Sequence, residues 1–342
     1  MTVIRWLILI FILALLSACK TMPKTAGISV SKLDENPDVL HFDLPETPYG
    51  RMVIDAGLPN GRTVKLVLDT GATRSALYAP EWNRLNLSGQ TAEIIRIHGM
   101  IDADMQPLVT LPTLQLGSAT LTNTPFARLN EPEKIARDRE IHDGILGMDI
   151  LSQYHLYVDR PAGVLKMVPV SLGPLTVPPS WRIVTLKPNP FIEDGRELHF
   201  LDIRLGNSLT PALLDTGSEF NLMNWNTSRF PQLRRVKRRL LEKWKIDGAV
   251  GTFTPVSKIS ATDYRAGQKV FDSADFVVLD FESLDVLGID DNPFIILGAR
   301  ALMTERYIID FNRDELVFAP VDEEKDYGSR GAMPTFTKRL RK

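Results

Sequence analysis

The chain has 342 residues, of which 44% are hydrophobic and 24% charged, and its formal net charge at pH 7 is -2. This is the composition of a globular protein with enough apolar residues for two lobes and a sizeable core. The small net charge excludes a global electrostatic attraction for nucleic acid or an acidic polymer. A single cysteine excludes an intrachain disulfide.

The N-terminal residues have the pattern of a secretion signal. Arg5 precedes an apolar run over 6–16, which is short for a membrane span and fits the hydrophobic region of a signal peptide. The next residues, Leu16-Ser17-Ala18-Cys19, resemble the bacterial lipobox, in which the cysteine is lipidated and becomes the new N-terminus. The resemblance implies a signal peptide over 1–18 and a lipid on Cys19. An ordinary signal peptide, or an uncleaved anchor with an incidental cysteine, is the alternative.

A lipid on Cys19 predicts a protein of the bacterial cell envelope that faces the periplasm. Lys20 follows the cysteine where an aspartate would suggest retention in the inner membrane of enteric bacteria, so the outer membrane is favoured. Residues 19–45 are polar and aperiodic, and we expect them to form a flexible tether between the lipid and a folded domain.

Residues 46–172 are predicted to form a first lobe of short strands and turns. A hairpin is expected around 114–121, a helical turn at 148–152, and helix or loop at 131–140. The predicted strands are 49–56, 63–68, 92–98, 106–111, 145–147, 154–159 and 164–168.

A stiff, proline-containing linker is expected at 173–180, followed by a second lobe over 181–320 and a polar tail over 321–342. The second-lobe strands are predicted at 197–205, 210–214, 253–259, 275–279 and 294–297.

Residues 224–245 are predicted to be a helical insertion with a strongly basic part at 229–245. A solvated helix face is the favoured interpretation of this basic part, and contact with anionic lipid or a cell-wall polymer is the alternative. The side chains expected to point inward are Leu233, Val236, Leu240 and Leu241.

One sequence pattern occurs twice. An apolar strand runs into Asp69-Thr70-Gly71 in the first half and into Asp215-Thr216-Gly217 in the second. Each half later carries an apolar strand ending in glycine, and Gly147 precedes Asp159 by 12 positions just as Gly298 precedes Asp310 by 12. This spacing indicates an internal duplication with two units, so we predict a pseudo-two-fold pair of lobes.

At these residues the chain resembles the pepsin-like and retropepsin-like aspartic proteases, over roughly residues 46–320. Members of that family carry Asp-Thr/Ser-Gly once per lobe, with an apolar-apolar-Gly strand later in the same lobe. The resemblance implies an all-β fold with two pseudo-two-fold-related lobes. It also implies an aspartic endopeptidase (a hydrolase) whose catalytic residues are Asp69 and Asp215.

Two matched carboxylates can perform general acid–base catalysis. When two carboxyl groups lie about 3 Å apart they cannot both ionise, so they share one proton. The ionised group can take a proton from water while the protonated group polarises a carbonyl, and no covalent intermediate forms. Because the pair titrates as a unit, the sequence alone leaves the separate roles of Asp69 and Asp215 open.

The neighbouring residues are expected to support the two loops. The resemblance implies that Thr70 and Thr216 bond across to the opposite loop. Gly71 and Gly217 allow a tight turn that brings backbone N–H groups near the carboxylates. Ser218 follows the second glycine, as in pepsins, whereas alanine follows the first, as in retropepsins.

The residues that cover the substrate are left open by the sequence. The pepsin flap carries a Tyr-Gly pair that 92–111 lacks, and the nearest match is His98-Gly99. The glycine-containing turn at 247–251 is a second candidate for a mobile flap.

The expected partners are a peptide or protein substrate and, through Cys19, a lipid membrane, with no nucleic acid. No cofactor is expected, and the five histidines lack metal-ligand spacing. Two motifs in one chain predict that a monomer suffices for activity. The alternatives are a catalytically silent, lipid-anchored peptide or envelope-binding protein with a protease-like fold and, more distantly, a structural envelope protein.

Overall fold

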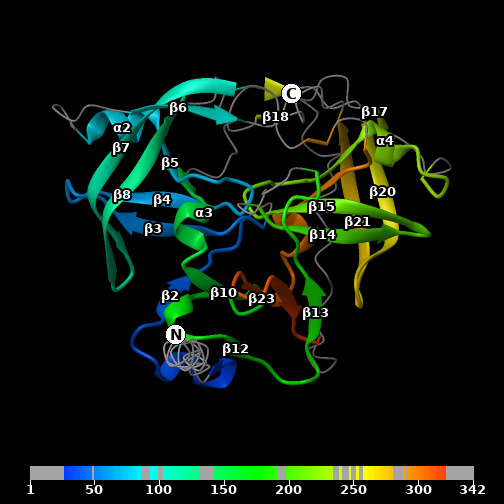
Figure 1. The fold of residues 1–342 in the computed structure, drawn as a ribbon, viewed down its shortest axis with the longest axis horizontal. Helices are drawn as coiled ribbons and strands as arrows, with labels where there is room; N and C mark the ends of the chain where they lie inside the picture. The colour runs from blue at the N-terminus through cyan, green and yellow to red at the C-terminus, as the bar shows by residue number, and fades with distance from the viewer. Residues whose placement is uncertain are drawn as a thin grey trace, which may run out of the picture.

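The protein is all-β and consists of short strands with a few helical turns (Figure 1). The computed structural model describes residues 27–47, 50–85, 93–98, 103–130, 142–191, 198–233, 239–240, 246–247, 252–253, 257–279, 288–289 and 292–320. The predicted signal peptide over 1–18, Cys19, the 131–140 segment and the predicted polar tail therefore lie outside the described residues.

The first half of the chain forms a seven-stranded sheet. Its centre is the parallel pairing of β4 with β9, and β5 runs antiparallel to β9. In spatial order the strands are β3 (Val53–Gly57), β4 (Thr63–Leu68), β9 (Gly144–Leu146), β5 (Ala76–Tyr78), β8 (Ala119–Leu129), β7 (Ala103–Leu116) and β6 (Glu93–His98).

The second half forms a seven-stranded sheet with the same order of corresponding strands. The parallel pairing of β15 with β22 matches that of β4 with β9, and the extra contact of β14 with β20 matches that of β3 with β7. In spatial order its strands are β14 (Phe200–Leu205), β15 (Ser208–Asp215), β22 (Ile295–Gly298), β16 (Asn221–Asn224), β21 (Lys269–Leu279), β20 (Ser257–Ala266) and β17 (Arg239–Leu240). The repeated topology agrees with the duplication that the sequence predicts.

A six-stranded sheet lies across the base of both halves (Figure 1). Antiparallel pairing of β10 with β23 at its centre joins the two halves, with Tyr157 opposite Ile308. In spatial order the strands are β13 (Arg182–Thr185), β24 (Glu315–Phe318), β23 (Arg306–Asp310), β10 (Tyr154–Asp159), β11 (Val164–Pro169) and β2 (Leu40–Asp43).

The N-terminal segment corrects the predicted tether over 19–45. Residues 28–45 belong to the fold: β1 (Ile28–Ser29) pairs with β12 (Leu175–Thr176), and β2 is the outer strand of the six-stranded sheet. Between them, η1 (Val30–Glu35) places Leu33 in an apolar cluster on the outer face of that sheet. The sparse apolar residues of this segment cover the outer face of the sheet from a short turn. A short turn has neither helix nor strand periodicity, so these residues show no periodic pattern in the sequence.

The predicted helical insertion over 224–245 is also wrong in its described part, while 234–238 and 241–245 lie outside the described residues. The helix α4 (Trp225–Ser228) spans one turn, capped by the Asn224 side chain, which accepts a bond from the Thr227 N–H at 3.0 Å. Pro231 follows closely, and proline disfavours helical backbone in the residue before it. Further on, Arg239 pairs with Lys258, so β17 is an edge strand and not part of a helix. Of the residues predicted to point inward, Leu233 is buried.

The remaining elements are short. They are α2 (Ala79–Arg84), α3 (Met148–Leu151), η2 (Val170–Leu172), η4 (Ala299–Ala301) and the separate hairpin of β18 (Ile246–Asp247) with β19 (Thr252–Phe253).

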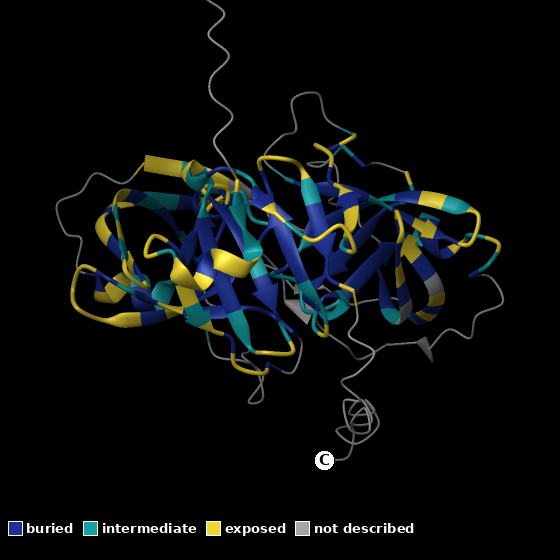
Figure 2. Cartoon of the chain, turned by 90° about the horizontal axis from the view of Figure 1, so that it is seen from below, coloured by how far each residue is buried: buried dark blue, intermediate teal, exposed yellow. Residues whose placement is uncertain are grey.

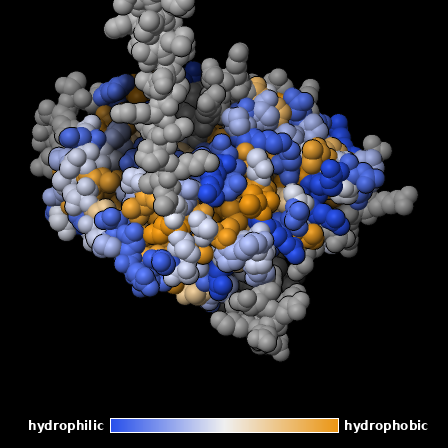
Figure 3. Space-filling model, turned by 60° about the horizontal axis from the view of Figure 1, so that its bottom comes forward, coloured by the Kyte–Doolittle hydropathy of each residue, from blue (hydrophilic) through white to orange (hydrophobic). Residues whose placement is uncertain are grey.

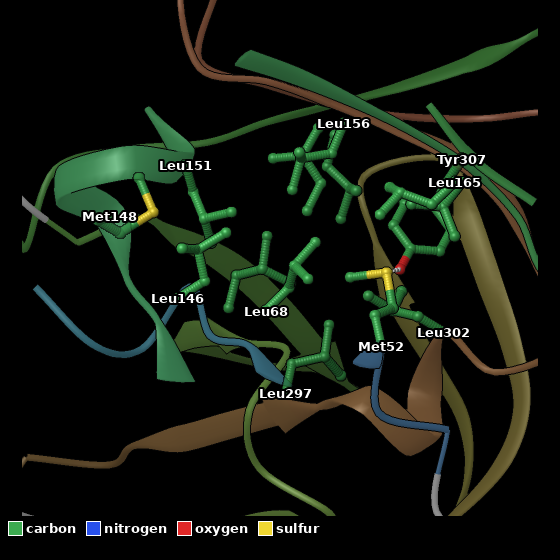
Figure 4. Close-up of a cluster of buried hydrophobic side chains, with 14 of the residues drawn as sticks. Met52, Leu68, Leu146, Met148, Leu151, Leu156, Leu165, Leu297, Leu302 and Tyr307 are labelled. Carbon is green, nitrogen blue, oxygen red and sulfur yellow. Dashed lines mark hydrogen bonds between the residues drawn. The ribbon is translucent and has the colours of Figure 1, made fainter. Parts of the chain in front are cut away.

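One apolar cluster joins all three large sheets (Figure 4). Leu68 and Leu146 come from the first sheet, Leu297 from the second, and Leu156 and Tyr307 from the six-stranded sheet. Figure 2 shows the buried residues concentrated along the inner strands, with exposure mostly in the turns. The ends of β4 and β15 are therefore fixed from behind by a continuous core, which is close-packed in folded proteins.

Hydrophobic side chains are also present on the surface, and Figure 3 shows some gathered among hydrophilic residues on the face turned forward. Among the described residues, the large hydrophobic side chains that are exposed are Ile94, Met105, Ile183, Leu209 and Val270. Within the described residues, no helix has the length and apolar character needed to cross a membrane.

The N-terminal correction can be tested at Leu33, which is fully buried at 0% exposure. Leu33→Ala removes apolar contacts and leaves a cavity, so we expect the free energy of unfolding to fall by about 2–4 kcal/mol in urea denaturation followed by circular dichroism. The exposed neighbour gives a matched control, because Lys32→Ala should change it by less than about 0.5 kcal/mol. Equal, small changes in both variants would instead support the predicted flexible tether.

Candidate active site

The two Asp-Thr-Gly loops meet where the central strands of the two halves end. Asp69 follows β4, and its N–H donates to the Leu146 carbonyl at 3.0 Å. Asp215 ends β15 and is paired with Gly298 of β22. Each aspartate therefore lies at the carboxyl end of two parallel strands. Both side chains are partly exposed, although the strands behind them are buried.

Crossed hydrogen bonds of two buried threonines join the loops. The Thr70 hydroxyl donates to the Leu214 carbonyl and the Thr216 hydroxyl donates to the Leu68 carbonyl, both at 2.7 Å. Each hydroxyl also accepts the backbone N–H of the other threonine, at 3.2 Å for Thr70 N–H and 3.1 Å for Thr216 N–H. The four bonds satisfy both hydroxyls and hold the loops in one relative position, as the resemblance implies for these threonines.

The glycines place each carboxyl group against the opposite loop. Gly71 N–H donates to Asp69 Oδ1 and Gly217 N–H donates to Asp215 Oδ1, both at 2.9 Å. A Cβ atom on Gly71 would lie 2.5 Å from the Asp215 Cγ, and one on Gly217 would lie 2.3 Å from the Asp69 Cγ. A side chain at either position would therefore displace the opposite carboxyl group.

The carboxyl groups of Asp69 and Asp215 lie close enough to influence each other's ionisation. Burial raises the pKa of Asp69 well above its usual value and the charge of Asp215 raises it further, against the Gly71 N–H bond. Burial also raises the pKa of Asp215, against bonds from the Ser218 N–H, Asp69 and the Gly217 N–H.

A polar side chain six residues after each aspartate supports the glycine strand behind it. Ser75 Oγ accepts the Gly147 N–H at 2.9 Å and donates to Asp149 Oδ1 at 2.7 Å. In the second half, Asn221 Oδ1 accepts the Gly298 N–H at 3.0 Å. Sequence reasoning missed these residues, although Ser75 and Asn221 occupy matching positions in the repeat.

A buried arginine lies beside the second motif and was also missed. Arg51 Nη2 is 2.8 Å from Glu219 Oε1, and the charge of Arg51 lowers the pKa of Asp215. Ser218, which was predicted as a supporting residue, donates its N–H to Asp215 Oδ1 at 2.9 Å and its hydroxyl to the Phe220 carbonyl at 2.9 Å. Glu219 could have been noticed in the sequence because it follows Ser218, just after the second motif. No sequence pattern marks Arg51.

Both candidate flaps lie largely outside the described residues. His98 ends β6, but Gly99 is not described, and in the turn at 247–251 only Asp247 is described. Among the described residues, no group of three or more His, Cys, Asp or Glu side chains is arranged to hold a metal ion.

Residues 54–150 match the aspartyl protease family. The match covers β4, Asp69-Thr70-Gly71 and the Gly147 strand, and therefore supports an aspartic protease-like relationship for the first half. No curated protein matches the chain in sequence. The second half lies outside this match; it repeats the topology of the first half and carries its own Asp-Thr-Gly loop.

The crossed threonine bonds predict a difference between two conservative substitutions. Thr216→Val keeps the shape but leaves the Leu68 carbonyl and the Thr70 N–H without their partner, so we expect the free energy of unfolding to fall by about 2–4 kcal/mol. Thr216→Ser keeps the hydroxyl and should lose much less. Urea denaturation of both variants measures the difference, and equal losses would mean that the hydroxyl bonds do not hold the loops together.

Proposed function

We propose that the chain is an aspartic endopeptidase that hydrolyses peptide bonds with water activated between Asp69 and Asp215. The observation that carries the proposal is the close approach of the two aspartates at the meeting point of two loops that repeat the same hydrogen bonding. A general acid and a general base are what direct attack of water on a carbonyl requires. The family match over 54–150 supports the same chemistry.

The proposed reaction needs one proton on the pair. The ionised aspartate accepts a proton from the attacking water, and the protonated aspartate donates to the carbonyl oxygen of the substrate. Gly71 and Gly217 N–H groups hold one oxygen of each carboxyl group, which leaves the other oxygens for water and substrate. An extended peptide suits a site between sheets, because main-chain hydrogen bonds supply affinity at low sequence specificity. Because both loops belong to one chain, a monomer would suffice.

Activity would depend on pH in both directions. As the pH falls, the ionised aspartate becomes protonated and the base is lost. As the pH rises through the raised pKa of the pair, the shared proton and with it the acid is lost. The proposal therefore includes a bell-shaped profile of kcat/KM.

We expect wild-type protein to cleave a diverse peptide mixture between pH 3 and 7, with new termini read by mass spectrometry. Asp69→Asn and Asp215→Asn should each lower the rate by about 10²–10⁴-fold, since each removes one of the two proton-transfer groups. Circular dichroism of each variant controls for folding. Folded wild-type protein that binds peptides but cleaves none over this range would support the alternative of a binding protein without turnover.

We also propose that Cys19 carries a lipid that anchors the protein in the bacterial cell envelope. The described residues begin at Gly27, so seven residues separate Cys19 from the described domain, a reach of at most about 28 Å over the eight Cα–Cα steps. β1 and β12 lie at the base of the fold, whereas β6 and β18 lie at the opposite end (Figure 1). In this arrangement the base faces the membrane, and substrates reach the site from the periplasm and not from the bilayer.

Metabolic labelling with a radioactive fatty acid tests the anchor. Full-length protein should become labelled, and Cys19→Ala should not, because this cysteine is the only thiol in the chain. Immunoblotting confirms that both proteins are made. Absence of label on the wild-type protein would leave an ordinary signal peptide as the explanation of the N-terminal pattern.

A further inference from the structure

The buried side chain of Arg51 contacts the loop of the second aspartate. Arg51 precedes β3, and its side chain is 5% exposed. Its Nη2 lies 2.8 Å from Glu219 Oε1, and its Nη1 lies 3.4 Å from His142 Nε2. Glu219 follows Asp215 by four residues, so this ion pair connects the first half of the chain to the loop of the second aspartate.

The repeat gives an internal comparison for this ion pair. Counting back from Asp202, which corresponds to Asp55, the counterpart of Arg51 is Leu198; Glu219 corresponds in turn to Thr73. Leu198 packs against an apolar cluster of the second half. Asp69 therefore lacks, at the corresponding position, the cation that Asp215 has.

Backbone hydrogen bonds differ in the same direction. Asp215 Oδ1 accepts two N–H groups at 2.9 Å, from Gly217 and Ser218. Asp69 Oδ1 accepts the Gly71 N–H at 2.9 Å, with a weaker bond from Ala72. Donors and a nearby positive charge both stabilise an ionised carboxylate relative to its protonated form.

We infer that Arg51, balanced by Glu219, makes the pair unsymmetrical, so that Asp215 is the ionised aspartate that accepts the proton of water and Asp69 is the one that holds the shared proton. This inference rests on the proposed function, because the proposed reaction is what gives the two aspartates the roles of base and acid. Arg51 is a positioning residue in this scheme, because it acts through Asp215 and not on the substrate.

The charges around the pair agree with this assignment. Asp215 is influenced by Asp69 and Arg51, and Arg51 contacts Glu219 and His142. Burial raises the pKa of Asp215, and this rise is partly offset by the Ser218 N–H and, more weakly, by Arg51. Glu219 offsets the charge of Arg51, so the two members of the ion pair should act on Asp215 in opposite directions.

Opposite shifts are the test of the inference. In profiles of kcat/KM against pH, Arg51→Met removes the cation and should move both limbs to higher pH. Glu219→Gln removes the negative charge that offsets Arg51 and should move both limbs to lower pH. We expect shifts of about 0.5–1 pH unit, at the low end of the effect of an opposite charge near a carboxyl group. The double variant Arg51→Met/Glu219→Gln removes both members of the ion pair, so its limbs should lie between those of the two single variants.

Leu198→Met supplies the matched control, because it changes the shape of the counterpart position without changing charge; its limbs should coincide with those of wild type. A merely structural ion pair would lower the rate in both variants without moving the limbs, or would move both in one direction. Either result overturns the inference and leaves the proposed function standing, provided that the wild-type protein cleaves peptides.

A measurement without turnover separates the two proposals. In full-length protein with ¹³C-labelled aspartate carboxyl groups, signals that disappear in Asp69→Asn or Asp215→Asn identify the pair, and their titration reports ionisation directly. Asp215 should ionise at lower pH than Asp69 in the wild-type protein, and Arg51→Met should raise the pH at which Asp215 ionises. Ionisation of Asp69 first would overturn the inference even in a protein that shows no cleavage.

Discussion

The crossed hydrogen bonds of Thr70 and Thr216 are the constraint on which the site depends. Each hydroxyl donates to a carbonyl of the opposite central strand and accepts the N–H of the other threonine. Both side chains are buried, so loss of one partner would leave polar groups without water to replace it. The relative position of the two halves is thus fixed at the loops that carry the aspartates.

The threonine hydrogen bonds are needed because the two aspartates destabilise the assembled loops. Burial raises the pKa of both carboxyl groups, and the charge of Asp215 raises that of Asp69 further. A carboxyl group whose pKa is higher in the folded protein than in the unfolded chain makes its full contribution to stability below its ordinary pKa. That contribution is lost as the pH rises through the folded value. Near neutral pH the pair therefore costs stability, which the threonine bonds and the shared apolar core behind Leu68 and Leu297 must offset.

The repeat explains why so much of this arrangement could be predicted from the sequence. Two Asp-Thr-Gly motifs at the ends of apolar strands, each followed by a glycine strand, determine local backbone geometry, and the observed sheets repeat strand by strand. The hairpin of β7 with β8 and the pair β10 with β11 follow from local turn and strand patterns in the same way.

The errors arise where long-range contacts decide the structure. Leu33 is a lone apolar residue in a polar segment, and only the distant sheet face that it covers makes that segment part of the fold. Arg239 and Leu240 fit a basic helix by composition, but the open edge of β20 accepts them as a strand. Local propensity is a weak guide where a distant edge or face supplies the stronger interaction.

Arg51 and Glu219 were missed for a related reason, since they are far apart in sequence and meet only when the halves assemble. They also mark where the two copies have diverged. The threonines, the motif glycines and the glycine strands serve the geometry of both halves and are the same in each. Leu198 and Thr73 stand where a symmetrical protein would repeat the ion pair. A symmetrical pair of loops brings two equivalent acids together. In the proposed reaction one is ionised and the other protonated, and a charge placed on one side would fix which is which without disturbing the shared scaffold.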